Sequence, residues 1–178
     1  SLLSLFDSPQ LHRQAAWLFA QTRHPASGAL GPIRRRPPDG KIRVAYFSAD
    51  FHNHATSHLM AELFEAHNAD RFELYGFSFG PDHRDDMRKR VASAFDQFFD
   101  VRQHGDRDIA RLARERGIDI AVDLKGYTED ARTDIFAARC APIQVNYLGY
   151  PGTMGSDYMD YVIADRIVDL GPGAGSAG

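Results

Sequence analysis

Hydrophobic and polar positions divide the chain into three parts. Between residues 41 and 165, short apolar runs alternate with segments whose apolar positions recur every three or four residues. Short apolar runs are typical of buried strands, and the longer spacing is typical of amphipathic helices. The predicted strands cover residues 42–48, 72–79, 98–102, 118–124, 144–148 and 161–164. The predicted helices between them cover residues 57–68, 83–95, 107–116 and 131–138.

This alternation predicts an α/β fold. Strands that alternate with helices form βαβ units, so we expect a Rossmann-like parallel sheet with flanking helices. Right-handed crossovers place the loops after the first, fourth and fifth strands at one edge of that sheet. Ligands of open α/β sheets bind at this edge, which is where we look for chemistry.

The two ends of the chain differ from this central part. Residues 8–23 have apolar positions at helical spacing, with Asp7 or Ser8 as the helix cap and Pro9 in the first turn. The following residues, up to 41, contain four prolines and three glycines, which predicts a linker. We therefore divide the chain into an N-terminal helix with its linker (1–40), an α/β lobe (41–165) and a glycine-rich tail (166–178).

Composition narrows the class of protein. Of 178 residues, 43% are hydrophobic and 25% are charged, as in globular proteins. The formal net charge of −3 offers no basic excess for a nucleic acid partner. The single cysteine, Cys140, cannot form an internal disulfide, which fits a reducing compartment. No apolar run reaches the 18 residues of a membrane span. We expect a cytoplasmic protein with neither a membrane nor a nucleic acid partner.

The segment from Asp50 to His58 concentrates the chemistry of the chain. It places one acid, one amide, two hydroxyls and three imidazoles between a predicted strand and a predicted helix. A helix amino terminus attracts anions through its free N–H groups, and imidazole transfers protons near neutral pH. The segment is therefore a candidate site for an anion or a substrate.

Two alternatives remain for this segment. In the first, Asp50 together with Thr56 or Ser57 caps the helix and the histidines are simply exposed. In the second, the three imidazoles bind a metal ion, although their spacing lacks a well-known closed zinc pattern. The ligands of such a metal site would be His52, His54 and His58, perhaps with Asp50.

Two further turns follow predicted strands and carry polar groups. After the fourth strand, Gly126 permits a tight turn, and Tyr127 and Thr128 add hydroxyls beside it. After the fifth strand, Tyr147 and Tyr150 flank a glycine turn and offer rings that stack on sugars. Each turn alone is equally consistent with a structural corner, but the fold brings all three segments to one edge.

In order along the chain, these segments resemble the amino-terminal catalytic lobe of the O-linked N-acetylglucosamine (O-GlcNAc) transferases. The resemblance covers residues 41–165, and four motifs carry it: D-F-x-N-H-x-T-S-H-L-M at 50–60, G-Y-T at 126–128, A-P-I-Q at 141–144 and L-G-Y-P-G-T at 148–153. Residues 1–23 also resemble the helix that joins this lobe to tetratricopeptide repeats in the family. The residues after Asp165 do not resemble the family.

The resemblance implies one lobe of a two-lobed, B-type glycosyltransferase. Such an enzyme transfers N-acetylglucosamine (GlcNAc) from UDP-GlcNAc to Ser or Thr of proteins, inverts the anomeric carbon and needs no metal or other cofactor. By the motif match, His54 lies beside the sugar-phosphate of the donor, and Asp50 is a candidate proton acceptor. The predicted substrate-binding residues are Asn53, Thr56, Tyr127, Thr128, Leu148, Gly149 and Tyr150.

The resemblance also implies partners. In the family, a second lobe supplies the uridine and diphosphate pocket and an essential lysine, and tetratricopeptide repeats precede the first lobe. We therefore expect this lobe to be inactive as a transferase without its second lobe, with an acceptor protein or peptide as substrate. The alternatives are a non-catalytic α/β module that binds a peptide or an anion at the same edge, and a metal-dependent hydrolase that uses the histidines.

Overall fold

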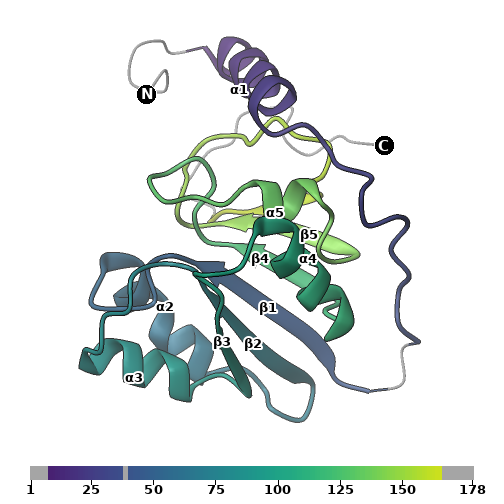
Figure 1. Ribbon diagram of the computed structural model, residues 1–178. Helices are drawn as coiled ribbons and strands as arrows, with labels where there is room; N and C mark the ends of the chain where they lie inside the picture. Colours follow the sequence, from purple (N-terminus) through teal and green to yellow (C-terminus); the bar gives the residue numbers. More distant parts are fainter. Residues whose placement is uncertain (1–7, 38–39, 166–178) are drawn as a thin grey trace.

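The computed structural model describes residues 8–37 and 40–165. In this part of the chain, six strands form one parallel sheet in the order β3-β2-β1-β4-β5-β6 (Figure 1). The strands are β1 (Ile42–Ser48), β2 (Phe72–Ser78), β3 (Gln97–Asp100), β4 (Ile120–Asp123), β5 (Ile143–Tyr147) and β6 (Tyr161–Ile163). The helices are α1 (Pro9–Arg23), α2 (Ala55–Glu65), α3 (Asp86–Ser93), α4 (Asp106–Glu115) and α5 (Asp134–Ala137). The predicted α/β fold with an N-terminal helix is confirmed.

Two apolar clusters cover the two faces of the sheet. In β1, Val44 and Tyr46 belong to the cluster that contains residues of α2 and α3. Ala45 and Phe47 point to the other face and belong to the cluster that contains residues of α4 and α5. A strand buried on both faces needs apolar residues at successive positions, which explains the continuous apolar run of β1.

The order of the strands defines where a ligand can bind. The chain adds β2 and β3 on one side of β1, and then adds β4, β5 and β6 on its other side. The winding therefore reverses between β1 and β4, and the crevice outside the carboxyl ends of these strands is the topological switch point. As predicted, the loops after β1, β4 and β5 lie at one edge.

Side-chain caps move two helix starts from their predicted positions. Helix α2 begins at Ala55, two residues early, because His54 caps it. Helix α3 begins at Asp86, three residues late, because the Asp85 carboxylate accepts the backbone N–H of Arg88 at 2.8 Å. The sequence pattern located both helices, whereas these caps depend on local geometry.

Other boundaries also differ from their predicted positions by a few residues. Strand β3 begins one residue and ends two residues before its prediction. Strand β5 ends at Tyr147 because Leu148 adopts a φ of 67°, which is incompatible with a strand. Helix α5 keeps four residues of the predicted eight, and Arg139, with a φ of 57°, follows its C-cap.

The N-terminal helix packs against the carboxyl edge of the sheet, and Figure 1 shows it above α5. Ser8 caps this helix by accepting a backbone N–H, as predicted. The Phe19 ring lies 4.9 Å from the Tyr127 ring, measured between centroids. His24 Nδ1 lies 2.7 Å from a carboxylate oxygen of Asp134 in α5. Helix α1 therefore supports the loop that follows β4.

Among the helices of residues 8–37 and 40–165, none combines the length and the apolar character that crossing a membrane requires.

The core predicts a large cost for removing Phe47. Its ring is fully buried, stacks on Phe77 at a centroid distance of 4.6 Å and meets the edge of Phe136 at 5.3 Å. We expect Phe47→Ala to lower the free energy of unfolding by about 3–5 kcal/mol in urea denaturation. Leu59→Ala is the control, because Leu59 is 67% exposed and should change stability by less than about 0.5 kcal/mol. Similar losses in both variants would contradict this position of the core.

Candidate functional site

Two serine hydroxyls hold the backbone of Asp50 at the end of β1. Ser48 Oγ accepts the Asp50 N–H at 2.9 Å, and Ser57 Oγ donates to the Asp50 carbonyl oxygen at 2.6 Å. Both serines are buried, so water does not compete for these hydrogen bonds. The Asp50 carboxylate therefore has a defined position at the carboxyl edge of the sheet.

The Asp50 carboxylate joins the loops that flank the switch point. Its Oδ2 accepts a hydrogen bond from Lys125 Nζ, in the loop after β4, at 2.8 Å. Asp50 and Lys125 are only 7% and 6% exposed. The same oxygen lies 3.7 Å from His54 Nδ1, which is beyond hydrogen-bond distance but near enough for the carboxylate charge to act on the ring.

His54 caps helix α2. Its backbone is extended, with φ −140° and ψ 152°, and its Nδ1 accepts the backbone N–H of Thr56 at 3.2 Å. The alternative in which Asp50 with Thr56 or Ser57 caps the helix is not formed, because His54 is the N-cap and the Ser57 hydroxyl bonds the Asp50 carbonyl oxygen. The His54 side chain is 44% exposed, so this capping ring also faces solvent.

The other polar residues of the same segment contact different partners. The Asn53 N–H donates to Asp85 Oδ2 at 2.9 Å, and Asn53 Oδ1 lies 2.8 Å from His58 Nε2. The His52 ring lies 4.4 Å from the His83 ring, and burial, followed by this neighbour, lowers the pKa of His52. Asn53 therefore ties the loop to the start of α3.

Metal binding by the three histidines finds no support in this geometry. Within residues 8–37 and 40–165, no group of three His, Cys, Asp or Glu side chains is arranged to hold a metal ion. His54 serves as a helix cap and His58 as a partner of Asn53, so their rings are engaged separately.

The Asp123 side chain stabilises the loop after β4. Its two carboxylate oxygens accept the backbone N–H groups of Lys125 at 2.9 Å and Gly126 at 3.1 Å. The Thr128 hydroxyl donates to the Lys125 carbonyl oxygen at 2.8 Å. Burial raises the pKa of Asp123 to about 6, although these two amides oppose the change. The Lys125 backbone is thus fixed on both sides.

Two glycines allow the loops after β4 and β5 to touch. Gly126 has a φ of 55°, and a Cβ at this position would lie 2.3 Å from the Cβ of Tyr150. A Cβ at Gly149 would lie 1.9 Å from the Leu124 carbonyl oxygen. Neither contact is possible for a larger residue without moving the backbone. The loop after β4 therefore lies between its two neighbours and contacts both.

The structure gives the predicted site residues unequal access to a ligand. Asp50 and His54 lie together at the switch point, and Leu148 and Gly149 follow β5 on the same edge. The Thr128 hydroxyl is engaged within its own loop, and the Tyr127 hydroxyl donates to the Met154 carbonyl oxygen at 2.7 Å. These two hydroxyls therefore stabilise the conformation of the loops.

The remaining predicted binding residues pack into the same group of loops. Thr56 is 8% exposed in the first turn of α2, where its backbone N–H meets the cap. The Tyr150 ring meets the Tyr127 ring at a centroid distance of 5.5 Å, and burial raises the pKa of both phenols. Both rings therefore pack at least partly inside the loop cluster.

Lys125 is the residue of this cluster that the sequence analysis missed. The available signal was a lysine directly after a buried strand that ends in Asp123 and Leu124. A charged residue in that position is unusual unless it is paired, but its partner, Asp50, lies 75 residues earlier in the sequence.

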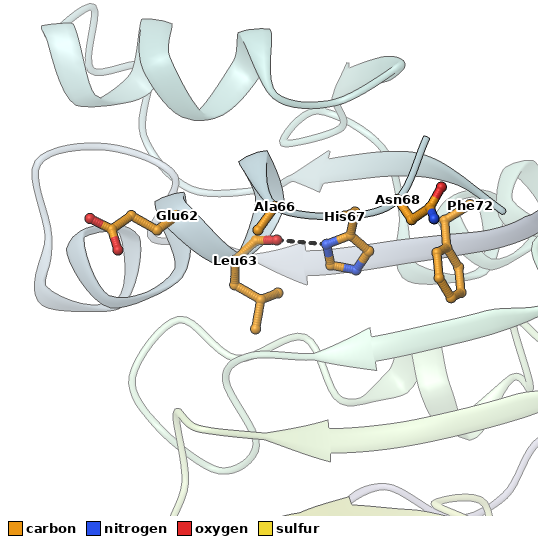
Figure 2. A pocket seen from close by; sticks show the side chains of 6 residues that line it. All are labelled: Glu62, Leu63, Ala66, His67, Asn68 and Phe72. Atoms are coloured by element: carbon orange, nitrogen blue, oxygen red, sulfur yellow. Dashed lines mark hydrogen bonds between the residues drawn. The ribbon is translucent and has the colours of Figure 1, made fainter. Parts of the chain in front are cut away.

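A cavity at the opposite edge of the sheet is separate from this site. It has a volume of about 570 Å³ and lies at the end of α2 and the start of β2 (Figure 2). His67 Nδ1 donates to the Leu63 carbonyl oxygen at 2.6 Å there. The lining residues are Glu62, Leu63, Ala66, His67, Asn68 and Phe72. Because β2 begins here, the cavity lies away from the carboxyl ends of the strands.

A doubly wound sheet with polar loops that converge at its switch point defines a Rossmann-like ligand-binding lobe. The chain matches the glycosyl transferase family 41 model over residues 31–170, and it belongs to this family. The predicted membership of the O-GlcNAc transferase group is confirmed.

Relatives and a solved structure agree with this membership. The chain is 38% identical over 137 residues to the probable UDP-N-acetylglucosamine–peptide N-acetylglucosaminyltransferase SEC of Arabidopsis thaliana, covering 77% of this chain and 14% of that protein. It is 37% identical over 129 residues to the UDP-N-acetylglucosamine–peptide N-acetylglucosaminyltransferase of Caenorhabditis elegans, covering 71% and 11%. A Thermobaculum terrenum O-GlcNAc transferase mutant, K341M, superposes with a TM-score of 0.79 at 29% identity, covering 89% of this chain and 31% of that one. The chain thus spans about one seventh or less of these two relatives.

The buried Asp123 carboxyl predicts a pH-dependent stability. Its folded pKa of about 6 exceeds the ordinary 3.8, so the folded state keeps this proton longer than the unfolded state. The resulting stabilisation is complete below the unfolded pKa and is lost as the pH rises through 6. Relative to Asp123→Asn, the free energy of unfolding of the parent chain should fall by about 1 kcal/mol between pH 5 and pH 7.5, as measured by urea denaturation.

Asp86→Asn serves as the control for this measurement, because the Asp86 side chain is 98% exposed. A difference between the parent chain and Asp123→Asn that does not change with pH would contradict the proposed ionisation of Asp123.

Proposed function

We propose that this lobe is part of a protein O-GlcNAc transferase, which moves GlcNAc from UDP-GlcNAc to Ser or Thr of proteins. Membership of family 41 and the names of the relatives support the proposal. The observation that carries it is the cluster of Asp50, Lys125 and the half-exposed His54 at the switch point. This is the position where an open α/β sheet binds a nucleotide-type ligand.

The proposed reaction is a metal-independent displacement with inversion. The acceptor hydroxyl oxygen forms a bond to the anomeric carbon as the bond from that carbon to the UDP oxygen breaks. The hydroxyl proton passes to a base or to water, and UDP leaves with the bonding electrons. Negative charge therefore grows on the diphosphate, and a donor placed there stabilises the transition state.

His54 and Asp50 have different roles in this proposal. The exposed His54 ring, at the start of α2, stabilises the leaving diphosphate beside the helix amino terminus. Asp50 is nearly buried and already accepts a hydrogen bond from Lys125, which fits the orientation of His54 better than contact with an acceptor hydroxyl.

The loops after β4 and β5 form the proposed sugar side of the site. Leu148 and Gly149 provide backbone groups beside the loop after β4. Thr56 lies at the start of α2. Tyr127 and Thr128 contribute through the shape of the loops, because their hydroxyls bond to backbone carbonyl oxygens. Asn53 orders the turn that carries His54.

The rest of the donor site belongs to a second lobe in this proposal. The chain spans 14% and 11% of the two relatives, and the uridine and most of the diphosphate charge need groups beyond the cluster described above. We propose that transfer in the cytoplasm needs both lobes, and that an acceptor protein binds between them.

A histidine substitution tests the proposed function. In a polypeptide that carries both lobes, His54→Ala should lower the rate of GlcNAc transfer from UDP-GlcNAc to a serine peptide by roughly 10²-fold, because one charge-stabilising donor is lost. The loss should appear in kcat more than in KM, with only a small fall in melting temperature from the lost helix cap. His67→Gln is the matched control, because His67 lies at the opposite edge, and it should keep its rate within about twofold.

A rate for His54→Ala equal to that of His67→Gln would exclude this role of His54. Binding of a peptide or an anion without any UDP-GlcNAc-dependent turnover would favour a non-catalytic module.

A further inference from the structure

The proposed reaction assigns no chemical role to the buried ammonium group of Lys125. A buried ion pair contributes little net stability, because the desolvation of both charges offsets their attraction. Lys125 and Asp50 are nevertheless held in one geometry by contacts on all sides: Asp123 and Thr128 fix the Lys125 backbone, and two serines fix the Asp50 backbone. This preorganisation indicates a role for the pair in the site itself.

The hydrogen bonds of His54 define which ring nitrogen holds the proton. Nδ1 accepts the Thr56 N–H, and an imidazole nitrogen accepts only when it carries no proton. The neutral ring therefore carries its proton on Nε2. The ring is 44% exposed, so this Nε2–H is available to an anionic ligand.

The Asp50 carboxylate opposes this arrangement on electrostatic grounds. Its Oδ2 lies 3.7 Å from the unprotonated Nδ1, and a negative charge at this distance favours a second proton on that nitrogen. A proton there would point to Asp50 and would end the hydrogen bond from the Thr56 N–H. The ammonium group of Lys125, 2.8 Å from the same oxygen, compensates the charge.

We propose that Lys125 is a positioning residue, which neutralises Asp50 so that His54 caps α2 through Nδ1 and presents Nε2–H to the ligand. His54 then acts as a hydrogen-bond donor to an anionic oxygen of the donor substrate and does not act as the general base. The role of His54 toward the donor substrate rests on the proposed function. The protonation of its two ring nitrogens can be tested without measuring GlcNAc transfer.

Besides Asp50 and Lys125, the titratable group beside the His54 ring is His52, which has neighbours of its own. The His52 ring lies 5.7 Å from the His54 ring, and His83 and Asp85 act on His52. These groups are retained in every variant below, so differences between variants report on the pair formed by Asp50 and Lys125.

Nitrogen NMR of the histidine rings in this chain measures the proposed effect. In the parent chain at neutral pH, His54 should show an unprotonated Nδ1 and a protonated Nε2, with its signals identified by their loss in His54→Gln. In Lys125→Met at the same pH, the Nδ1 signal of His54 should move toward that of a protonated nitrogen. Hydrogen exchange of the Thr56 amide should become about fivefold faster, because its cap is lost.

Two further variants keep the test decisive. Asp50→Asn removes the negative charge and keeps the ammonium group, so the His54 Nδ1 signal should not move toward that of a protonated nitrogen. This variant tests the proposal even if Lys125→Met does not fold, since an uncompensated buried carboxylate is costly. Lys89→Met is the matched control, because Lys89 pairs with Asp86 on the surface, and its His54 signals should equal those of the parent chain.

Unchanged His54 signals in folded Lys125→Met, or shifts of the same sign in Lys125→Met and Asp50→Asn, would overturn the proposal. A protonated Nδ1 in the parent chain would do the same. None of these outcomes depends on whether the protein transfers GlcNAc, so a failure of this inference is distinguishable from a failure of the proposed function.

Discussion

The ion pair between Asp50 and Lys125 is the interaction on which the site depends. It connects the loop after β1 with the loop after β4, across the crevice where the winding of the sheet reverses. The surrounding hydrogen bonds fix both backbones, so the ion pair itself has to order only the two side chains. From this pair, the contacts extend to His54 on one side and, through Gly126 and Gly149, to the loop after β5 on the other.

The sequence predicted the architecture because the signals for it are local. Apolar runs marked every strand of the described sheet, and the capping by Ser8 follows from side-chain chemistry within a few residues. Topology then placed three loops at one edge without any knowledge of contacts. The starts of α2 and α3 differ from their predicted positions because a histidine and an aspartate cap these helices.

The chemistry of the site was less predictable because it depends on long-range pairs. Asp50 was identified from its place after β1, but its partner Lys125 is separated from it by 75 residues. The same sequence that offered Tyr127 and Thr128 as ligand hydroxyls also contains the carbonyl groups that engage them, at Met154 and Lys125. Which hydroxyl remains available is decided by folding, and the pattern of residue types alone does not reveal it.

The most direct measurement is a titration of the isotopically labelled chain with UDP-GlcNAc up to millimolar concentration, followed by the backbone amide signals. If the switch point is the donor site, the largest changes will occur at Thr56, Gly126 and Gly149, even when binding is weak. Changes confined to the residues of the cavity around His67 would contradict a donor site at the carboxyl edge of this sheet.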